Sequence, residues 1–455
     1  MNSSWTKDAI FYHIYPLGLC AAPERNDLTL PAVERLNTLT PWLNHIQSLG
    51  ANAIYLGPVL QSSSHGYDTI DYYQVDRRLG DNQTLARFAD ALHKRGMRLV
   101  LDAVFNHVGR DFWAFRDLLV HSEKSHYCDW FHNLRFGENS PEGDPFQYES
   151  WDGHYSLVKL NLKNRDVRAH IFDAVAMWMD QFGIDGLRLD AADCIDLDFL
   201  QALHDFTKAR RPDFWLIGEV VHGDYRKWAN PATLDSVTNY ECYKGLYASL
   251  KDANYFEIAY GINRQFGDDG IYRGIPLYNF VDNHDVDRVA SKLNDPGLLY
   301  PLYMLLFTMP GIPSIYYGSE WGITGVKARW TDAPLRPALD IKSMMHKAPQ
   351  PDLSSVIQRL SKIRQASPAL KSGTYRQIFV DHKQYAFLRQ LEEEKVLIIL
   401  NSDVEKKELV LEVPWREGVL KDQLNPGGPF SIHDGKVRLS IPPRWGRILL
   451  LSKER

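Results

Sequence analysis

Two patterns of apolar and polar positions alternate along this chain. Eight short runs rich in aliphatic and aromatic residues predict buried strands. These runs are residues 9–16, 51–58, 97–107, 183–191, 214–221, 235–241, 276–285 and 312–320. The segments between them, such as residues 36–50, 83–96 and 167–183, carry apolar residues three and four positions apart and end in glycine. This spacing is typical of amphipathic helices.

Eight alternating strands and helices favour an α/β fold, a (β/α)8 TIM barrel. An open doubly wound parallel sheet has the same alternation and is the structural alternative on pattern alone. A stretch dense in Trp, His and Tyr, residues 108–160, separates the third and fourth strands, and we interpret it as an inserted domain, domain B. A helix over residues 351–366 ends the alternation. The barrel domain is therefore expected to span residues 1–370.

The last part of the chain has a different pattern. Four strand-like runs, residues 384–390, 395–403, 407–413 and 446–452, are separated by turn-forming residues. We expect residues 371–455 to form a small C-terminal antiparallel β-sandwich.

Composition and charge restrict the class of partner. The chain has 455 residues, a net charge of −5 and only four cysteines. A slightly acidic protein is not expected to bind nucleic acid or an anionic membrane, because both favour a basic excess. The cysteines are far apart, so free thiols are expected rather than zinc ligands or disulfides. No signal peptide or continuous apolar run of membrane-spanning length is found, and we expect a cytoplasmic protein.

Polar residues concentrate where the predicted strands end. They are Asp102, Asn106 and His107 after the third strand, Arg188 and Asp190 on the fourth, Glu219 after the fifth, and Asn283, His284 and Asp285 after the seventh. The carboxyl ends of barrel strands meet at one rim, which is where barrel enzymes carry their sites. We therefore expect these side chains to lie together.

Three carboxylates at one rim suggest acid–base chemistry. Burial and the neighbouring Asp190 and Asp285 are expected to keep Glu219 protonated. A protonated acid beside ionised carboxylates is the arrangement of a retaining glycosidase. Two other interpretations stay open on the residues alone. Arg188 and Asp190 could form a structural ion pair, or the cluster could bind a divalent ion, although Arg188 argues against a cation at its centre.

The same stretches resemble the four signature regions of glycoside hydrolase family 13, the α-amylase family. The matching stretches, in the order of the family, are DAVFNH (102–107), GLRLDAAD (186–193), GEV (218–220) and FVDNHD (280–285). The likeness extends over most of residues 8–370. It implies that Asp190 is the nucleophile, Glu219 the general acid/base and Asp285 the carboxylate that stabilises the transition state.

The resemblance also implies a set of substrate-binding residues. These are Tyr67, Asp102, His107, Arg188, His284, Asp332 and Arg336. Arg188 would orient Asp190, and Asp102 would support the site from the third strand. The two histidines would hydrogen-bond the reacting sugar, and Tyr67 would stack on it. Asp332 and Arg336 would contact the next sugar, with an exposed salt bridge as the alternative for that pair.

The expected activity is hydrolysis of α-1,4-linked malto-oligosaccharides, with cyclodextrins as a further candidate substrate. LVKLN, residues 157–161, is similar to the MPKLN stretch of neopullulanases and cyclomaltodextrinases. The chain starts directly with the first strand, so we expect it to lack the N-terminal domain of those enzymes, and either a monomer or a homodimer is expected. A 4-α-glucanotransferase is the enzymatic alternative, and a non-catalytic sugar-binding family member is the minor one.

No cofactor is expected to be required. Asn106 matches a position that many α-amylases use as a calcium ligand, so Ca2+ is retained as an optional ion. The alternative for Asn106 is a hydrogen bond that holds the loop of His107.

Overall fold

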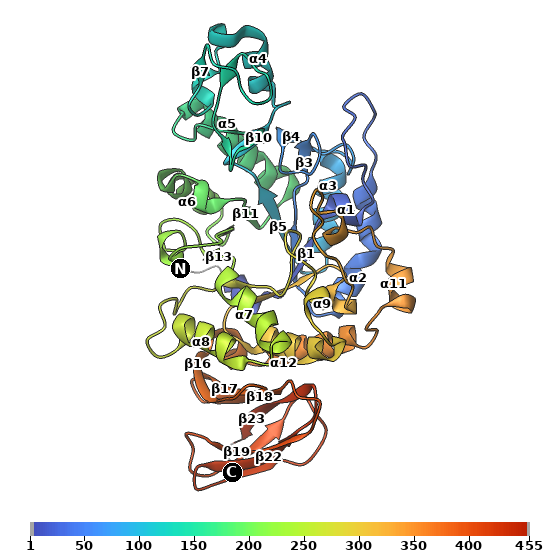
Figure 1. Ribbon diagram of the computed structural model, residues 1–455, viewed down its shortest axis with the longest axis vertical. Helices are drawn as coiled ribbons and strands as arrows, with labels where there is room; N and C mark the ends of the chain where they lie inside the picture. The colour runs from blue at the N-terminus through green and yellow to red at the C-terminus, as the bar shows by residue number, and fades with distance from the viewer. Residues whose placement is uncertain (1–3, 453–455) are drawn as a thin grey trace.

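The computed structural model describes residues 4–452, which form three parts. Figure 1 shows a central barrel, an inserted region at one end of the molecule, and a C-terminal sheet at the other end. In the described part of the chain, no helix is both long and apolar enough to cross a membrane.

Eight parallel strands build the barrel. Their order around the sheet follows their order in the chain, and the eighth strand pairs with the first. A parallel bridge between Thr238 and Tyr278 closes the remaining gap, between the sixth and seventh strands. This closure confirms the barrel and excludes the doubly wound sheet. The strands are β1 (Phe11–Ile14), β2 (Ala53–Leu56), β5 (Arg98–Ala103), β11 (Gly186–Leu189), β12 (Trp215–Gly218), β13 (Ser236–Val237), β14 (Tyr278–Asn279) and β15 (Ile312–Tyr316).

Helices surround the barrel, as the amphipathic spacing predicts. Asn164 caps one of them, α5, by accepting hydrogen bonds from two backbone N–H groups of its first turn, and Gly183 with φ 65° ends the turn that follows it. Outside the inserted region, the helices are α1 (Pro16–Leu19), α2 (Thr40–Ser48), α3 (Asn82–His93), α5 (Arg165–Met177), α6 (Leu197–Arg210), α7 (Tyr240–Lys251), α8 (Tyr255–Phe266), α9 (Val289–Lys292), α10 (Leu299–Thr308), α11 (Ile341–Lys347), α12 (Leu353–Ala366) and α13 (Pro368–Ser372).

The alternation of side chains on β11 explains its mixed composition. Leu187 and Leu189 pack into the cluster between barrel and helices, whereas Gly186 and Arg188 occupy the barrel side. Gly186 is required there, because a Cβ atom would lie 2.5 Å from the carbonyl oxygen of Trp215. The barrel interior below Arg188 is apolar. Arg188 therefore marks the boundary between the packed barrel and its polar rim.

The inserted region follows β5 and returns to the same rim. Its elements are β6 (His107–Gly109), α4 (Trp113–His121), β7 (Arg135–Phe136), β8 (Phe146–Gln147), β9 (Ser150–Trp151) and β10 (His154–Lys159). β10 pairs antiparallel with β6, so that Lys159 lies opposite His107. The LVKLN stretch therefore lies beside a predicted site residue. A second excursion, the hairpin of β3 (Leu60–Ser62) and β4 (Thr69–Val75), carries Tyr67 in its loop.

The C-terminal part is one antiparallel sheet of eight strands that encloses a separate apolar core. Four of the strands match the predicted runs, and the other four were not predicted. Three of these mix polar and apolar residues without a regular pattern, whereas residues 436–441, KVRLSI, alternate regularly and were missed. Helices α8, α10 and α13 pack against this sheet. Its strands are β16 (Thr374–Val380), β17 (Gln384–Leu391), β18 (Glu394–Asn401), β19 (Lys407–Glu412), β20 (Gly418–Asp422), β21 (Phe430–His433), β22 (Lys436–Ile441) and β23 (Trp445–Ser452).

Candidate active site

The polar residues predicted at the strand ends do meet at one rim. In the parallel register, Arg188 of β11 lies opposite Asp102 of β5. Its Nη1 atom donates to Asp102 at 2.9 Å and to Asp190 at 2.8 Å, and its Nη2 atom lies 2.8 Å from Oε2 of Glu219. One guanidinium thus holds three carboxylates from three neighbouring strands.

The backbone after β11 fixes the two carboxylates that flank the Arg188 side chain. The N–H of Asp190 donates to the carbonyl of Ala103 at 3.0 Å, which continues the ladder beyond the last residue of the strand. Ala191 then adopts the left-handed conformation with φ 44°, and its N–H donates to Oε2 of Glu219 at 3.2 Å. A non-glycine residue in this region is strained, and such strain concentrates at functional sites.

Burial raises the pKa of Asp190 well above its ordinary value. Arg188 opposes this shift, and the negative charges of Glu219 and Asp102 add to it. Asp190 and Glu219 both contact the guanidinium of Arg188, so one cation neutralises part of the charge of each. The expected location of the proton on Glu219 stays a prediction.

The third carboxylate, Asp285, has different partners. Nε2 of His284 lies 3.0 Å from one carboxylate oxygen, and Nη2 of Arg336 lies 3.0 Å from the other. Burial alone would raise the pKa of Asp285, but these two neighbours hold it well below its ordinary value. Asp285 is therefore the carboxylate of the three that is held as an anion by two basic side chains.

Asp102 lies beneath the site rather than in it. Its side chain is fully buried, and it accepts hydrogen bonds from Tyr55 at 2.7 Å, Tyr67 at 2.8 Å and Arg188. A buried carboxylate with three donors cannot contact a ligand directly. The supporting role expected for Asp102 fits this position, whereas direct substrate binding does not.

Tyr67 and His284 lie together at the rim. The Tyr67 hydroxyl is hydrogen-bonded to Nε2 of His284, and the two rings are nearly parallel, with centroids 5.5 Å apart. Tyr67 is half-buried, so part of its ring faces outward. An aromatic face beside hydrogen-bonding groups suits a sugar ring.

His107 has an unused nitrogen in the site. Its Nε2 atom lies 3.9 Å from Asp190 and is buried without a hydrogen-bond partner among the described residues. Burial lowers the pKa of His107 to about 3, so the ring is neutral at pH 7. A neutral imidazole N–H can donate to a ligand hydroxyl.

Asn106 makes the hydrogen bond to the loop of His107 that was considered for it above. Its Nδ2 atom lies 3.1 Å from Nδ1 of His107, so it orients that ring. Within residues 4–452, no group of three or more His, Cys, Asp or Glu side chains is placed to hold a metal ion. The optional calcium ion at Asn106 stays a prediction, and no step of the chemistry below uses a metal ion.

Asp332 and Arg336 do not form an isolated exposed pair. The Arg336 side chain is only 10% exposed, and its Nη2 atom bonds Asp332 and Asp285, both at 3.0 Å. Its Nε atom donates to the carbonyl of His284 at 2.9 Å. Arg336 therefore connects the loop after β15 to Asp285. Asp332 contacts the opposite partner of this ion pair, Arg336, and not Asp285 itself.

The structure adds residues that the sequence interpretation missed. Tyr15, after β1, packs under the Arg336 guanidinium at 4.5 Å and bonds the carbonyl of His65. Tyr240, at the start of α7, donates to Oε1 of Glu219 at 3.4 Å and accepts from Asn283 at 3.1 Å. Both follow barrel strands, so the strand-end rule applied to β1 and β13 would have found them.

The arrangement supports acid–base and nucleophilic chemistry on a neutral, hydroxyl-rich ligand. Two carboxylates that share one cation can act as acid and nucleophile, while a third, charge-stabilised carboxylate faces them. The neutral imidazole of His107, the ring of His284 and the hydroxyl of Tyr67 surround the three groups. This is the donor set of a retaining glycosidase.

Comparisons with known proteins lead to the same family. Residues 32–352 match the family model described as "Alpha amylase, catalytic domain". A cyclomaltodextrinase of Bacillus sp is 32% identical over 88% of this chain and 74% of its own length. Neopullulanase 2 of Thermoactinomyces vulgaris is 31% identical over 98% of this chain and 78% of its own length.

A solved structure shows the same likeness over the whole fold. The debranching enzyme of Nostoc punctiforme, soaked with acarbose, superposes with a TM-score of 0.81 and 29% identity over 98% of both chains. The family model alone covers more than two thirds of this chain. The protein is a glycosidase and belongs to the α-amylase family, glycoside hydrolase family 13.

Proposed function

We propose that this protein hydrolyses the α-1,4-glucosidic bonds of malto-oligosaccharides with net retention, and that it also opens cyclodextrins. The observation that carries the proposal is the contact of Arg188 with both Asp190 and Glu219. Retaining glycosidases keep their two carboxyl groups only about 5 to 5.5 Å apart, and a shared guanidinium favours such a short separation. The names of the relatives support the substrate class.

Each carboxylate has a role in the proposed mechanism. Asp190 attacks the anomeric carbon while Glu219 protonates the glycosidic oxygen of the leaving group. The resulting glycosyl ester on Asp190 is then hydrolysed by water that Glu219 activates as a base. Arg188 holds both side chains in place, and Asp285 stabilises the positive charge that develops on the sugar.

The neighbouring side chains bind the reacting sugar. The free Nε2 of His107 donates to a hydroxyl next to the nucleophile. Tyr67 offers its ring as a stacking surface, and His284 hydrogen-bonds the sugar from the side of Asp285. Arg336 orients Asp285 through the ion pair at 3.0 Å, and Asp332 contacts the following sugar.

A time course of products tests the proposal. The panel is maltotriose, maltoheptaose, β-cyclodextrin, pullulan and sucrose, and Asp190→Asn is the inactive control. Steady release of glucose and maltose from the first three substrates supports the proposal. Elongated oligosaccharides as the main products would instead identify a glucanotransferase, and a panel without turnover would overturn the substrate assignment.

Three further points need separate measurements: the requirement for a metal ion, the oligomeric state and the cellular location. The proposed steps use side chains of this chain alone, so we expect unchanged activity after exhaustive chelation, whereas loss with recovery on adding Ca2+ would assign the ion. We further propose a cytoplasmic monomer or homodimer. All four cysteines, Cys20, Cys128, Cys194 and Cys242, are free thiols, which suits a reducing compartment. Fractionation of the source cells and light scattering check these two points.

A further inference from the structure

The C-terminal part contains a cavity that the reaction does not use. It has a volume of about 400 Å³, within the range of roughly 300–1,000 Å³ that small-ligand sites have. The residues that line it include Asp268, Arg376, Leu388, Gln390, Lys395 and Trp415. Figure 1 shows the C-terminal sheet at the opposite end of the molecule from the inserted region, which borders the active site. A ligand in this cavity would therefore be remote from Asp190.

Strand register explains why the lining side chains share one face. Gln390 of β17 lies opposite Thr374 of β16 and opposite Lys395 of β18. Leu388 and its partner Arg376 are two positions further along. Side chains two positions apart point to the same side, so these residues form a common floor.

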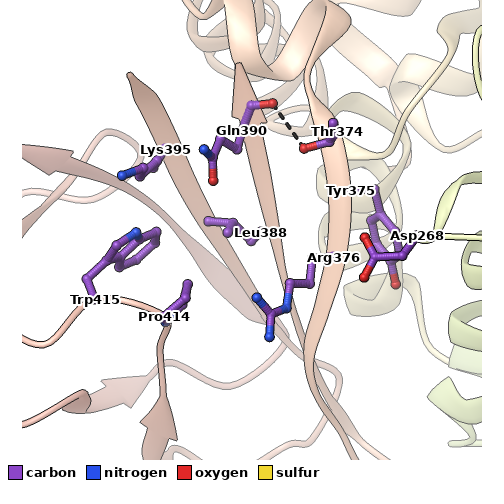
Figure 2. A pocket seen from close by; sticks show the side chains of 9 residues that line it. All are labelled: Asp268, Thr374, Tyr375, Arg376, Leu388, Gln390, Lys395, Pro414 and Trp415. Carbon is purple, nitrogen blue, oxygen red and sulfur yellow. Dashed lines mark hydrogen bonds between the residues drawn. The ribbon is translucent and has the colours of Figure 1, made fainter. Parts of the chain in front are cut away.

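Trp415 lies over this floor from the segment between β19 and β20. Figure 2 shows Trp415 on one side and Arg376 on the other, with Leu388 between them and Gln390 near Thr374 and Lys395. The Trp415 side chain is half-buried. Its ring centroid is 5.8 Å from Nζ of Lys395, which places a hydrogen-bond donor beside the indole.

Two charged side chains that line the cavity, those of Arg376 and Asp268, are unpaired in the described residues. Across residues 4–452, neither the Arg376 guanidinium nor the Asp268 carboxylate makes a hydrogen bond or ion pair, and both residues are exposed. Donors and acceptors of both signs are therefore available around an aromatic face. The carboxylate disfavours a phosphate or other anion. A neutral polyol with an apolar ring face uses all of these groups at once.

We propose that this cavity is a second α-glucan-binding site, in which a glucose unit stacks on Trp415 and hydrogen-bonds Arg376, Gln390 and Asp268. The proposal rests on the proposed function, because it assigns the same class of ligand. Binding a long glucan at a site remote from the cleft raises the local concentration of the chain at the enzyme. The cavity should therefore lower KM for long substrates, which can reach both sites, and leave KM for short substrates unchanged.

Calorimetric titration of the full-length Asp190→Asn protein with maltoheptaose tests the site. We expect two molar equivalents to bind, and only one after Trp415→Ala is added. Arg376→Ala should lower the affinity for the second equivalent about tenfold. Because Arg376 is exposed, this substitution should not impair folding. Arg416→Ala is the matched control, because its exposed side chain lies next to Trp415 but does not line the cavity. If the Trp415→Ala and Arg376→Ala variants titrate like the parent, the proposal is overturned.

Activity measurements separate this proposal from the proposed function. In the otherwise unmodified enzyme, Trp415→Ala should raise KM for soluble starch about tenfold and leave maltotriose hydrolysis unchanged. An equal loss on both substrates would contradict a remote binding site. Failure of the unmodified enzyme to hydrolyse maltotriose would overturn the proposed function. The titrations of Asp190→Asn with and without Trp415→Ala would still show whether the cavity binds maltoheptaose.

Discussion

Nη1 of Arg188 lies 2.8 Å from Oδ1 of Asp190, two positions further along the chain on the same side of β11. The pair is not an isolated structural salt bridge, because Glu219 and Asp102 bind the same guanidinium. Breaking one contact of a buried ionic network leaves charge uncompensated, which is costly. The position of the proposed nucleophile and that of the proposed acid/base are thus coupled through one side chain.

Arg188→Lys should therefore impair turnover more than binding. A lysine carries one ammonium group and cannot span three carboxylates in the fork geometry of arginine. We expect kcat for maltotriose to fall about 100-fold with a smaller change in KM, measured by initial rates. Arg98→Lys is the control, because Arg98 pairs with Asp185 at the amino end of the same barrel at 2.7 Å. Unchanged kcat in Arg188→Lys would show that the shared contact does not matter for the reaction.

Tyr240→Phe should lower turnover modestly. The Tyr240 hydroxyl donates to Oε1 of Glu219 at 3.4 Å and so helps to hold this carboxyl group in position. Because the hydrogen bond is long, we expect kcat for maltotriose to fall less than about tenfold, measured by initial rates. Tyr243→Phe provides a matched control, since the Tyr243 hydroxyl is buried without a hydrogen-bond partner in the described residues. Equal kcat values for the two variants would show that Tyr240 does not position Glu219.

The barrel and its carboxylates were predictable because their signals are local in the sequence. Apolar runs of four to eight residues define the strands, and a polar residue directly after such a run must lie at the rim. Asp190 and Glu219 directly follow β11 and β12, whereas Asp285 lies six residues after β14 and is reached only because the predicted run continued to residue 285. The position of Asp102 beneath the rim was less evident, because its burial depends on Tyr55 and Tyr67, which come from other segments.

Other features depend on contacts that no local pattern contains. Strands β20 and β21 are short and mix polar with apolar residues, and they are strands because β23 and β22 pair with them. The ion pair of Arg336 with Asp285 joins residues 51 positions apart, so the sequence could suggest a sugar contact but not the coupling. The cavity under Trp415 likewise arises only when the C-terminal sheet is assembled.

Gly186→Ala should destabilise the barrel directly below the site. The added Cβ atom would lie 2.5 Å from the carbonyl oxygen of Trp215, and both partners are fixed by the β-ladder. Overpacking of a tight core costs about 1–3 kcal/mol, so we expect a lower Tm by differential scanning calorimetry. Gly428→Ala is the control, because no atom lies within 4 Å of a Cβ built there. Equal Tm values for the two variants would contradict the close packing at β11.

The burial of His107 should make the stability of the protein sensitive to acid. The pKa of His107 is about 3 in the folded protein, below the ordinary value of 6.5. Between these values the unfolded chain binds the extra proton, so the stabilisation is fully present above pH 6.5 and is lost progressively as the pH falls towards 3. At pH 5 this side chain alone should lower the free energy of unfolding by about 2 kcal/mol relative to neutral pH.

Urea unfolding of the wild type and His107→Gln at pH 7 and pH 5 measures this contribution. Glutamine does not titrate, so the free energy of unfolding should fall by about 2 kcal/mol less in the variant than in the wild type when the pH is lowered from 7 to 5. This difference does not depend on the stability of the variant at pH 7. His433→Gln is the control, because the side chain of His433 is 81% exposed and lies in the C-terminal sheet. If His107→Gln loses as much stability as the wild type on acidification, other buried groups such as His13, whose pKa is also lowered by burial, carry the acid sensitivity.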